Sequence, residues 1–186
     1  MIAPVSGVIS SLESVLLDAE KIQARVRQMA QEVERDFAGQ EITVVSLMDG
    51  ALFFAADLLR LVDLPVRLHT LSVSSYHGGT ASSGRVEIAQ LLPTDLQGRH
   101  VLLIDDILDT GLTLGTVLEH LAASGPAVLR SAVLLRKDRS RVREVSADYV
   151  GFDIADEFVV GYGMDYQGRY RNLPCIGILN PARLQP

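Results

Sequence analysis

The stretch from Val101 to Leu114 constrains the fold more than any other part of the sequence. Four consecutive apolar residues, Val101 to Ile104, predict a short buried strand. Three carboxylates follow at Asp105, Asp106 and Asp109, and then a Thr-Gly-x-Thr segment. Apolar residues next recur at helical spacing, at Leu114, Val117, Leu118 and Leu121. The predicted order is therefore a strand, an acidic loop that carries a glycine, and a helix.

This order is suited to a ligand that carries a phosphate and hydroxyl groups. The first amides of a helix lack internal partners and carry the positive end of its dipole. Gly111 lets those amides approach an anion, and the hydroxyls of Thr110 and Thr113 can add donors. The upstream carboxylates are better suited to accept hydrogen bonds from sugar hydroxyls or to hold a divalent cation. A ribose 5-phosphate would match both halves of the segment.

Two other classes of protein also place aspartate after an apolar strand. A P-loop enzyme would need the pattern G-x-x-x-x-G-K-[ST], which occurs nowhere in this chain. A receiver domain would carry its acidic pair after the first strand, whereas these carboxylates lie past the middle of the chain. The sugar-phosphate interpretation is therefore favoured over both.

Composition limits the partners and the location. The 186 residues suffice for one domain, 1–186, with a sizeable core, and the net charge of −6 argues against nucleic acid and against anionic membranes. The single cysteine excludes an internal disulfide framework. The N-terminal segment does not resemble a targeting signal, and no apolar run approaches membrane-spanning length. We expect a cytoplasmic protein.

The rest of the chain predicts an α/β fold with a mainly parallel sheet flanked by helices. A helix capped by Asp18 should present one apolar stripe, and the strand Ile42 to Met48 should lead through Asp49-Gly50 into a helix from Ala51 to Val62. Further strands are expected at 66–76, 85–92 and 129–135. Three short β segments, 148–154, 158–163 and 175–179, should form a small hood over the sheet edge.

Several motifs resemble the type I phosphoribosyltransferase family, and in particular its hypoxanthine-guanine members. The string Val-Leu-Leu-Ile-Asp-Asp-Ile-Leu-Asp-Thr-Gly carries the resemblance most clearly, and the resemblance extends from about the first helix to the C-terminus in the order of that family. The other motifs are Val-Ser-Ser-Tyr at 73–76, Asp-Tyr-Val-Gly-Phe at 148–152, Phe-Val-Val-Gly-Tyr-Gly-Met-Asp-Tyr at 158–166 and Tyr-Arg-Asn-Leu-Pro at 170–174.

The resemblance implies where 5-phosphoribosyl 1-diphosphate would bind. Its phosphoribosyl part would contact Asp105, Asp106, Asp109, Thr110, Gly111, Leu112 and Thr113. Its diphosphate would contact Met48, Asp49, Gly50 and Arg171. The family usually has Leu-Lys-Gly with a cis peptide before the lysine, whereas this chain has Asp49 at that position, so we expect backbone recognition with the Asp49 side chain turned away. A flexible lid would begin at Ser75 and Tyr76.

The same resemblance assigns the purine, the metal and the proton transfer. The base would be held by Lys137, Phe158, Val159 and Asp165. Mg²⁺ would be held by Asp105, Asp106 and Asp165 together with the diphosphate oxygens. Asp109 would lie near N7 of the base as the catalytic general acid/base.

The implied reaction is phosphoribosyl transfer to N9 of hypoxanthine or guanine, which gives IMP or GMP and diphosphate in purine salvage. The resemblance also implies a homo-oligomer, either a dimer or a tetramer. Two alternatives stay open: another type I phosphoribosyltransferase that acts on xanthine or a pyrimidine, and a regulator that senses phosphoribosyl diphosphate on the same fold. Turnover assays with different bases separate these possibilities.

Overall fold

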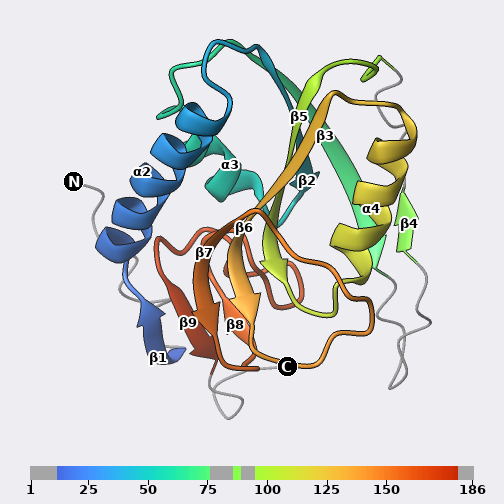
Figure 1. Ribbon diagram of the computed structural model, residues 1–186. Helices are drawn as coiled ribbons and strands as arrows, with labels where there is room; N and C mark the ends of the chain where they lie inside the picture. Colours follow the sequence, from blue (N-terminus) through green and yellow to red (C-terminus); the bar gives the residue numbers. More distant parts are fainter. Residues whose placement is uncertain (1–11, 76–85, 89–94, 180–186) are drawn as a thin grey trace.

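The apolar strands of the sequence pair into one six-stranded sheet in the order β4-β3-β2-β5-β6-β7 (Figure 1). A computed structural model describes residues 12–75, 86–88 and 95–179 of the chain. The strands from β3 to β7 in this order run parallel, and β4 pairs antiparallel with β3. The bounds are β2 (Ile42–Met48), β3 (Val66–Ser75), β4 (Val86–Ile88), β5 (His100–Leu108), β6 (Val128–Lys137) and β7 (Tyr149–Ile154).

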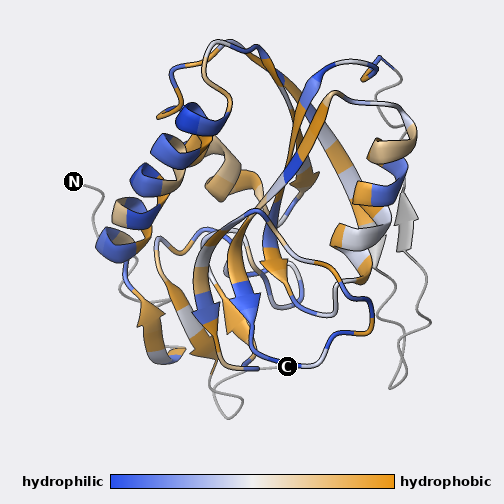
Figure 2. Ribbon diagram, viewed as in Figure 1, coloured by the Kyte–Doolittle hydropathy of each residue, from blue (hydrophilic) through white to orange (hydrophobic). Residues whose placement is uncertain are grey.

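Helices cover both faces of the parallel sheet (Figure 1). On one face α2 (Ala19–Asp36) and α3 (Leu52–Leu59) pack with Val44 and Leu102, while on the other face α4 (Leu112–Ala123) packs with Val45 and Leu103. Successive residues of a strand point to opposite faces, so strands buried on both sides need continuous apolar runs. Figure 2 shows these runs as apolar strands between helices whose outer faces are more polar.

The first helix forms as the sequence predicts. Asp18 caps α2, because its Oδ1 accepts a hydrogen bond of 2.8 Å from the amide of Lys21. The apolar stripe of the helix is fully buried against the sheet, at Ile22, Val26, Met29, Ala30 and Val33. Among the described residues, no helix is both long enough and apolar enough to cross a membrane.

The hood is a separate antiparallel sheet in the order β1-β9-β8, and its composition differs from the prediction. Its strands are β1 (Leu12–Leu17), β8 (Val159–Val160) and β9 (Ile176–Leu179). The segment 148–154, predicted to belong to the hood, instead supplies β7, which pairs parallel with β6. The sequence does not predict β1, because that segment lacks alternation and its partner β9 lies at the other end of the chain.

Two strands extend further than predicted, and both extensions carry expected site residues. Strand β5 continues through Leu108, so Asp105 and Asp106 lie within the strand rather than in the loop after it. Strand β6 ends at Lys137, which places this lysine at the carboxyl end of the sheet. Ligands of open parallel sheets bind at that edge.

Candidate functional site

The turn between β5 and α4 has the geometry of a phosphate loop. Gly111 precedes the helix with a φ of 81°, a left-handed conformation that favours glycine. The hydroxyl of Thr110 accepts a hydrogen bond of 3.4 Å from the amide of Leu112. The amides of Leu112 and Thr113 therefore begin a helix whose positive end points at the expected phosphate position.

The segment at Val142 and Arg143, which is distant in sequence, supports this loop through backbone contacts. The Thr110 carbonyl accepts hydrogen bonds from the amides of Val142 and Arg143 at 3.0 and 3.1 Å. A Cβ on Gly111 would overlap the Arg143 carbonyl oxygen, so the two backbones are in close contact. The loop is consequently held from two directions, and only glycine fits at position 111.

Asp105, which is buried, and Asp106, which is partly exposed, form an acidic pair near the carboxyl end of β5. Asp105 is 7% exposed, and its burial together with the neighbouring Asp106 charge raises its pKa well above the ordinary value. Burial also raises the pKa of Asp106, although the amide of Ile107, which donates to Asp106 Oδ1 at 2.9 Å, and the Arg171 charge lower it. Shielding two neighbouring carboxylates from water costs free energy unless a cation or hydroxyl donors bind them. This cost is consistent with a role in ligand binding.

The loop after β2 lies directly against this acidic pair. The peptide bond between Met48 and Asp49 is cis, as the family resemblance implies. A Cβ on Gly50 would overlap the Asp106 carboxylate, so Gly50 brings the two segments into contact. Asp49 is exposed, and its carboxylate has no hydrogen-bond or ion-pair partner among the described residues. The orientation of this side chain relative to a bound diphosphate stays a prediction.

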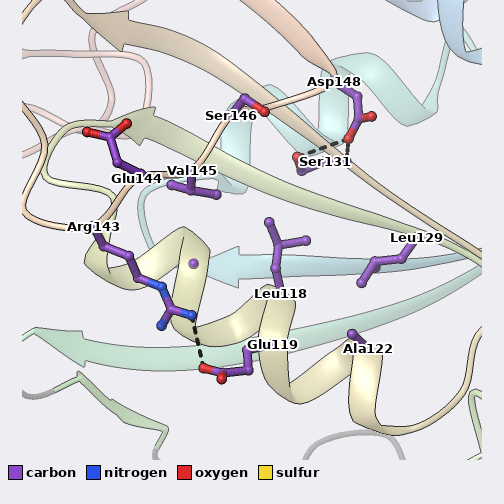
Figure 3. A pocket seen from close by; sticks show the side chains of 11 residues that line it. Leu118, Glu119, Ala122, Leu129, Ser131, Arg143, Glu144, Val145, Ser146 and Asp148 are labelled. Carbon is purple, nitrogen blue, oxygen red and sulfur yellow. Dashed lines mark hydrogen bonds and ion pairs between the residues drawn. The ribbon is translucent and has the colours of Figure 1, made fainter.

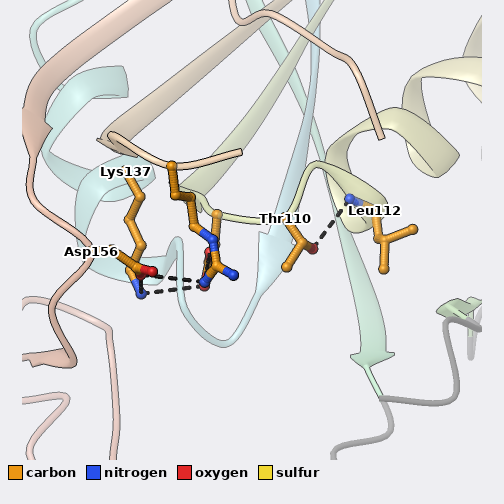
Figure 4. A network of polar contacts seen from close by, with 6 residues as sticks. Thr110, Leu112, Lys137 and Asp156 are labelled. Atoms are coloured by element: carbon orange, nitrogen blue, oxygen red, sulfur yellow. Dashed lines mark hydrogen bonds and ion pairs between the residues drawn. The ribbon is translucent and has the colours of Figure 1, made fainter. Parts of the chain in front are cut away.

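Four charged side chains form a cluster at the ends of β5 and β6 (Figure 4). Lys137 Nζ lies 3.3 Å from Asp109 Oδ2 and 3.2 Å from Asp156 Oδ1. Arg139 Nη1 lies 3.1 Å from Asp109 Oδ1 and 3.3 Å from Asp156 Oδ1. The structure thus brings Lys137, one of the residues expected to hold the base, into contact with Asp109, the residue expected to transfer a proton. Lys137 is only 9% exposed, so its pairing with carboxylates is needed to offset burial of its charge.

An exposed aromatic ring lies in the segment that follows this cluster. Phe158 is 56% exposed. Its ring packs edge to face with the ring of Tyr166, and the two ring centroids are 5.9 Å apart. Val159 is buried in β8. A large apolar ring left in contact with solvent is suited to stack on a planar ligand.

The loop after β8 presents Asp165 and Arg171 as a pair. Arg171 Nη2 lies 2.9 Å from Asp165 Oδ1, and Arg171 Nη1 donates to the Gly163 carbonyl at 2.6 Å. Asp165 Oδ2 also accepts from the Gly168 amide at 2.7 Å. These contacts hold the guanidinium within range of the Asp106 charge. An arginine fixed in this way can bind a diphosphate through its planar fork.

Oxygen ligands for a magnesium ion are present but few. Within the described residues, no group of three or more histidine, cysteine, aspartate or glutamate side chains is arranged to hold a metal ion by itself. The carboxylates of Asp105 and Asp106 supply only oxygen donors, which suit a hard cation. Because Mg²⁺ commonly takes one or two carboxylates plus substrate phosphate oxygens, these residues fit an ion that binds together with a diphosphate.

The expected lid falls mostly outside the described residues. Ser75 is the last residue of β3, where its backbone pairs with Val86. Tyr76 lies beyond the described part of the chain. The lid assignment of Ser75 and Tyr76 stays a prediction.

A pocket elsewhere on the protein contains none of the expected site residues (Figure 3). It lies between α4, β6 and the segment 143–148, and two pairs of its polar residues contact each other. Arg143 Nη2 lies 2.9 Å from Glu119 Oε2, and Asp148 Oδ2 accepts from the Ser131 amide at 2.8 Å. We assign no ligand to this pocket, because these charges already have partners.

Sequence reasoning missed the partners of Lys137 and the support of the phosphate loop. Arg139 belongs to a basic run that is typical of a solvated loop, and Asp156 follows a different strand. Val142 supports Thr110 only through its backbone, which carries no side-chain signal. A weak signal for Arg139 was its position two residues after Lys137.

Comparisons with known proteins agree on one family. A family model described as the phosphoribosyl transferase domain matches residues 14–167. The hypoxanthine-guanine phosphoribosyltransferase of Mycobacterium avium is 46% identical over 94% of this chain and 89% of its own length. A Staphylococcus aureus hypoxanthine phosphoribosyltransferase structure has a TM-score of 0.91 at 38% identity and covers 98% of this chain and 99% of its own. A Trypanosoma cruzi structure of such an enzyme in complex with the product IMP has a TM-score of 0.85 at 36% identity, over 92% of this chain and 96% of its own.

Proposed function

The chain belongs to the hypoxanthine-guanine phosphoribosyltransferases of the type I phosphoribosyltransferase family, and from this premise we propose how its residues perform purine salvage. The reaction transfers the phosphoribosyl group of 5-phosphoribosyl 1-diphosphate to N9 of hypoxanthine or guanine and releases diphosphate. The observation that carries the proposal is the juxtaposition of Asp109 and Lys137, 3.3 Å apart, beside the phosphate loop. Asp109 and Lys137 can both contact a purine whose sugar phosphate is bound by the loop.

The phosphoribosyl group binds along β5 and the start of α4. The 5-phosphate accepts hydrogen bonds from the loop Asp109 to Thr113, where Gly111 allows close approach of the backbone amides. Asp105 and Asp106 accept hydrogen bonds from the ribose hydroxyls. Cleavage of the C1–O bond leaves positive charge on the sugar ring, and nearby carboxylates stabilise that charge.

The diphosphate binds between the β2–α3 loop and Arg171. Gly50 and the neighbouring backbone of Met48 and Asp49 form one side of this site, and the Arg171 guanidinium forms the other. A magnesium ion, when bound, neutralises the diphosphate charge and assists its departure. Asp105, Asp106 and Asp165 would hold that ion, either directly or through water.

The purine binds at the ends of β6 and β8. Lys137 donates to the 6-oxo group, Phe158 stacks on the ring, and the backbone of Val159 contacts the base edge. Asp109 lies near N7 and transfers a proton as the general acid/base. Lys137 can only donate, so an oxo group is preferred over the amino group of adenine.

Turnover with five bases tests this assignment. Purified protein is assayed with 5-phosphoribosyl 1-diphosphate, magnesium and hypoxanthine, guanine, xanthine, adenine or uracil, and nucleotide formation is measured. We expect the highest kcat/KM with hypoxanthine and guanine. A preference for xanthine or uracil would indicate another type I transferase. Binding of phosphoribosyl diphosphate without turnover of any base would indicate a regulator.

Three further properties are part of the proposal. Residues 1–186 act as one domain in the cytoplasm, as a dimer or a tetramer. Support for self-association comes from α3, where Leu52 and Phe53 are large apolar residues that are 45% and 37% exposed. Sedimentation measurements on the wild type and on a Phe53→Glu variant test this. We expect the variant to shift toward the monomer.

A further inference from the structure

The two loops proposed to hold the diphosphate touch each other backbone to backbone. A Cβ on Gly163 would overlap the Gly50 carbonyl oxygen, and a Cβ on Gly50 would overlap the Asp106 carboxylate. The Gly163 carbonyl in turn accepts the 2.6 Å hydrogen bond from Arg171 Nη1. Any movement of Gly163 therefore changes the distance between the Gly50 loop and the Arg171 guanidinium.

Tyr162, which precedes Gly163, has an unusual backbone conformation. Its φ is 51°, a left-handed value that is unfavourable for a non-glycine residue. Such a conformation persists only where the surroundings determine it, and it often marks a functional site. Here the Tyr162 amide donates to the Leu173 carbonyl at 2.9 Å, and the residue is only 5% exposed.

The Tyr162 hydroxyl connects this loop to the helix that follows Gly50. It donates a hydrogen bond of 2.6 Å to Asp57 Oδ2 in α3, which begins at Leu52. Asp57 is itself fixed, because Gln23 Nε2 donates to the same oxygen at 2.5 Å and Arg60 Nη2 lies 2.6 Å from the other. Burial and the bond to Asp57 raise the pKa of Tyr162 far above its ordinary value, so the hydroxyl stays a donor.

We propose that Tyr162, through Asp57, is a positioning residue that sets the separation of the Gly50 loop and the Arg171 loop and thereby the affinity for the diphosphate group. This proposal rests on the proposed function, because it assigns the diphosphate to those loops. Tyr162 belongs to the same buried core cluster as residues of α3, and its hydroxyl bond to Asp57 adds a directional link to this packing.

The chain offers a matched control for a purely structural role. Tyr149 is 4% exposed, and its hydroxyl donates to Asp36 Oδ2 at 3.0 Å, so it is also a buried tyrosine bound to a helix carboxylate. Tyr149 lies in β7, and this hydrogen bond does not reach the residues assigned to diphosphate. Both Tyr→Phe changes remove the same kind of bond, but only one of them should change diphosphate binding.

Kinetics and binding on these two variants test the proposal. We expect Tyr162→Phe to raise KM for 5-phosphoribosyl 1-diphosphate on the order of tenfold, with KM for hypoxanthine within about twofold of wild type. Tyr149→Phe should change neither KM. The proposal would be overturned if Tyr162→Phe changed KM equally for both substrates, or if it left KM for 5-phosphoribosyl 1-diphosphate unchanged.

A second pair of variants covers the case in which Tyr162→Phe does not fold. Asp57→Asn keeps an oxygen acceptor for the tyrosine and should retain near wild-type KM, whereas Asp57→Leu should resemble Tyr162→Phe. A raised KM in Asp57→Asn together with a near wild-type KM in Asp57→Leu would contradict the proposal.

Titration calorimetry with magnesium diphosphate separates this proposal from the proposed function. If the wild type turns over no purine, the proposed function fails, yet weaker diphosphate binding by Tyr162→Phe than by Tyr149→Phe still supports the positioning role. Equal binding by both variants overturns the positioning role whatever the turnover.

Discussion

Lys137 and Asp109 form an ion pair, and each contacts a second residue of opposite charge. Lys137 contacts Asp156, and Asp109 contacts Arg139. The cluster therefore contains two cations and two carboxylates. A base that binds Lys137 exchanges one of these ion pairs for a hydrogen bond to its 6-oxo group, while Arg139 still balances Asp109. The individual roles of Asp109 and Lys137 can be separated by kinetics.

Asp109→Ala should lower kcat on the order of 10²-fold, because a general acid/base commonly contributes that much. KM for 5-phosphoribosyl 1-diphosphate should change little, since the loop amides are proposed to hold the phosphate. Steady-state kinetics on this variant and on Asp138→Ala, which removes an exposed carboxylate next to Lys137, provide the comparison. An unchanged kcat would remove Asp109 from this role.

Lys137→Met should raise KM for hypoxanthine and reduce discrimination against adenine, because the ammonium donor to the 6-oxo group is lost. Arg136→Met is the matched control: Arg136 is the neighbouring cation, and it pairs at 2.5 Å with the exposed Asp153. Initial rates at varied base concentration, measured for both variants, provide the comparison. If both variants bind hypoxanthine like the wild type, the base is recognised elsewhere.

Asp49→Asn should leave turnover within a fewfold of wild type and strengthen diphosphate binding. A carboxylate about 4 Å from a diphosphate charge would be repelled by roughly 4 kcal/mol in a partly shielded site, so an exposed side chain directed away is favoured. Competitive inhibition by diphosphate measures the change. A large loss of turnover would mean that the carboxylate itself takes part.

The phosphate loop is an element whose shape depends on a single glycine. Gly111 combines a φ of 81° with close contact to the Arg143 carbonyl, whereas Gly98 has a similar φ of 71° and no atom within 4 Å of the position that a Cβ would take. Substitutions at these two glycines therefore distinguish the free-energy cost of a left-handed backbone from the cost of steric overlap.

Gly98→Ala should lower the free energy of unfolding by about 1 kcal/mol, which is the cost of the left-handed conformation alone. Gly111→Ala should cost more and should also raise KM for 5-phosphoribosyl 1-diphosphate, because the loop must move away from Arg143. Urea unfolding and steady-state kinetics on both variants test this. Equal losses of stability with an unchanged KM would show that the loop tolerates a side chain.

Across the whole molecule, a partly buried contact joins the edge strand β7 to helix α2. The Tyr149 hydroxyl in β7 donates to Asp36 at the end of α2, and this bond is the largest cause that holds the Asp36 pKa below its ordinary value of 3.8. Arg25 of α2 also donates to the carbonyls of Val150 and Gly151, so β7 is tied to α2 at several points.

Tyr149→Phe should destabilise the protein in a pH-dependent way. Because the pKa of Asp36 is lowered by folding, the stability it contributes is fully present above 3.8 and is lost as the pH falls through the lowered value. The difference in free energy of unfolding between wild type and variant should therefore be larger at neutral pH than in acid. Urea unfolding across this range measures it, and a difference that grows toward acid would contradict the assignment.

The elements whose signals are local can be predicted from neighbouring residues alone. The continuous apolar runs of β2, β5 and β6, the Asp18 cap of α2 and the glycine-bearing turn before α4 depend on neighbouring residues, and the sequence predicts all of them. The motifs expected to bind the ribose phosphate, at 101–114, and most of the base site, at 158–166, are also readable because each is a short continuous segment, whereas Lys137 lies apart from both.

The features that join distant parts of the chain depend on how the whole chain packs, so no local pattern predicts them. Strand β1 exists through pairing with β9, and β7 joins the parallel sheet because β6 offers its free edge. The same holds for the charge cluster around Lys137 and for the contact of Gly163 with Gly50. A local pattern specifies which conformation a segment prefers, but the partner that satisfies its hydrogen bonds and charges is chosen by the packing of the whole chain.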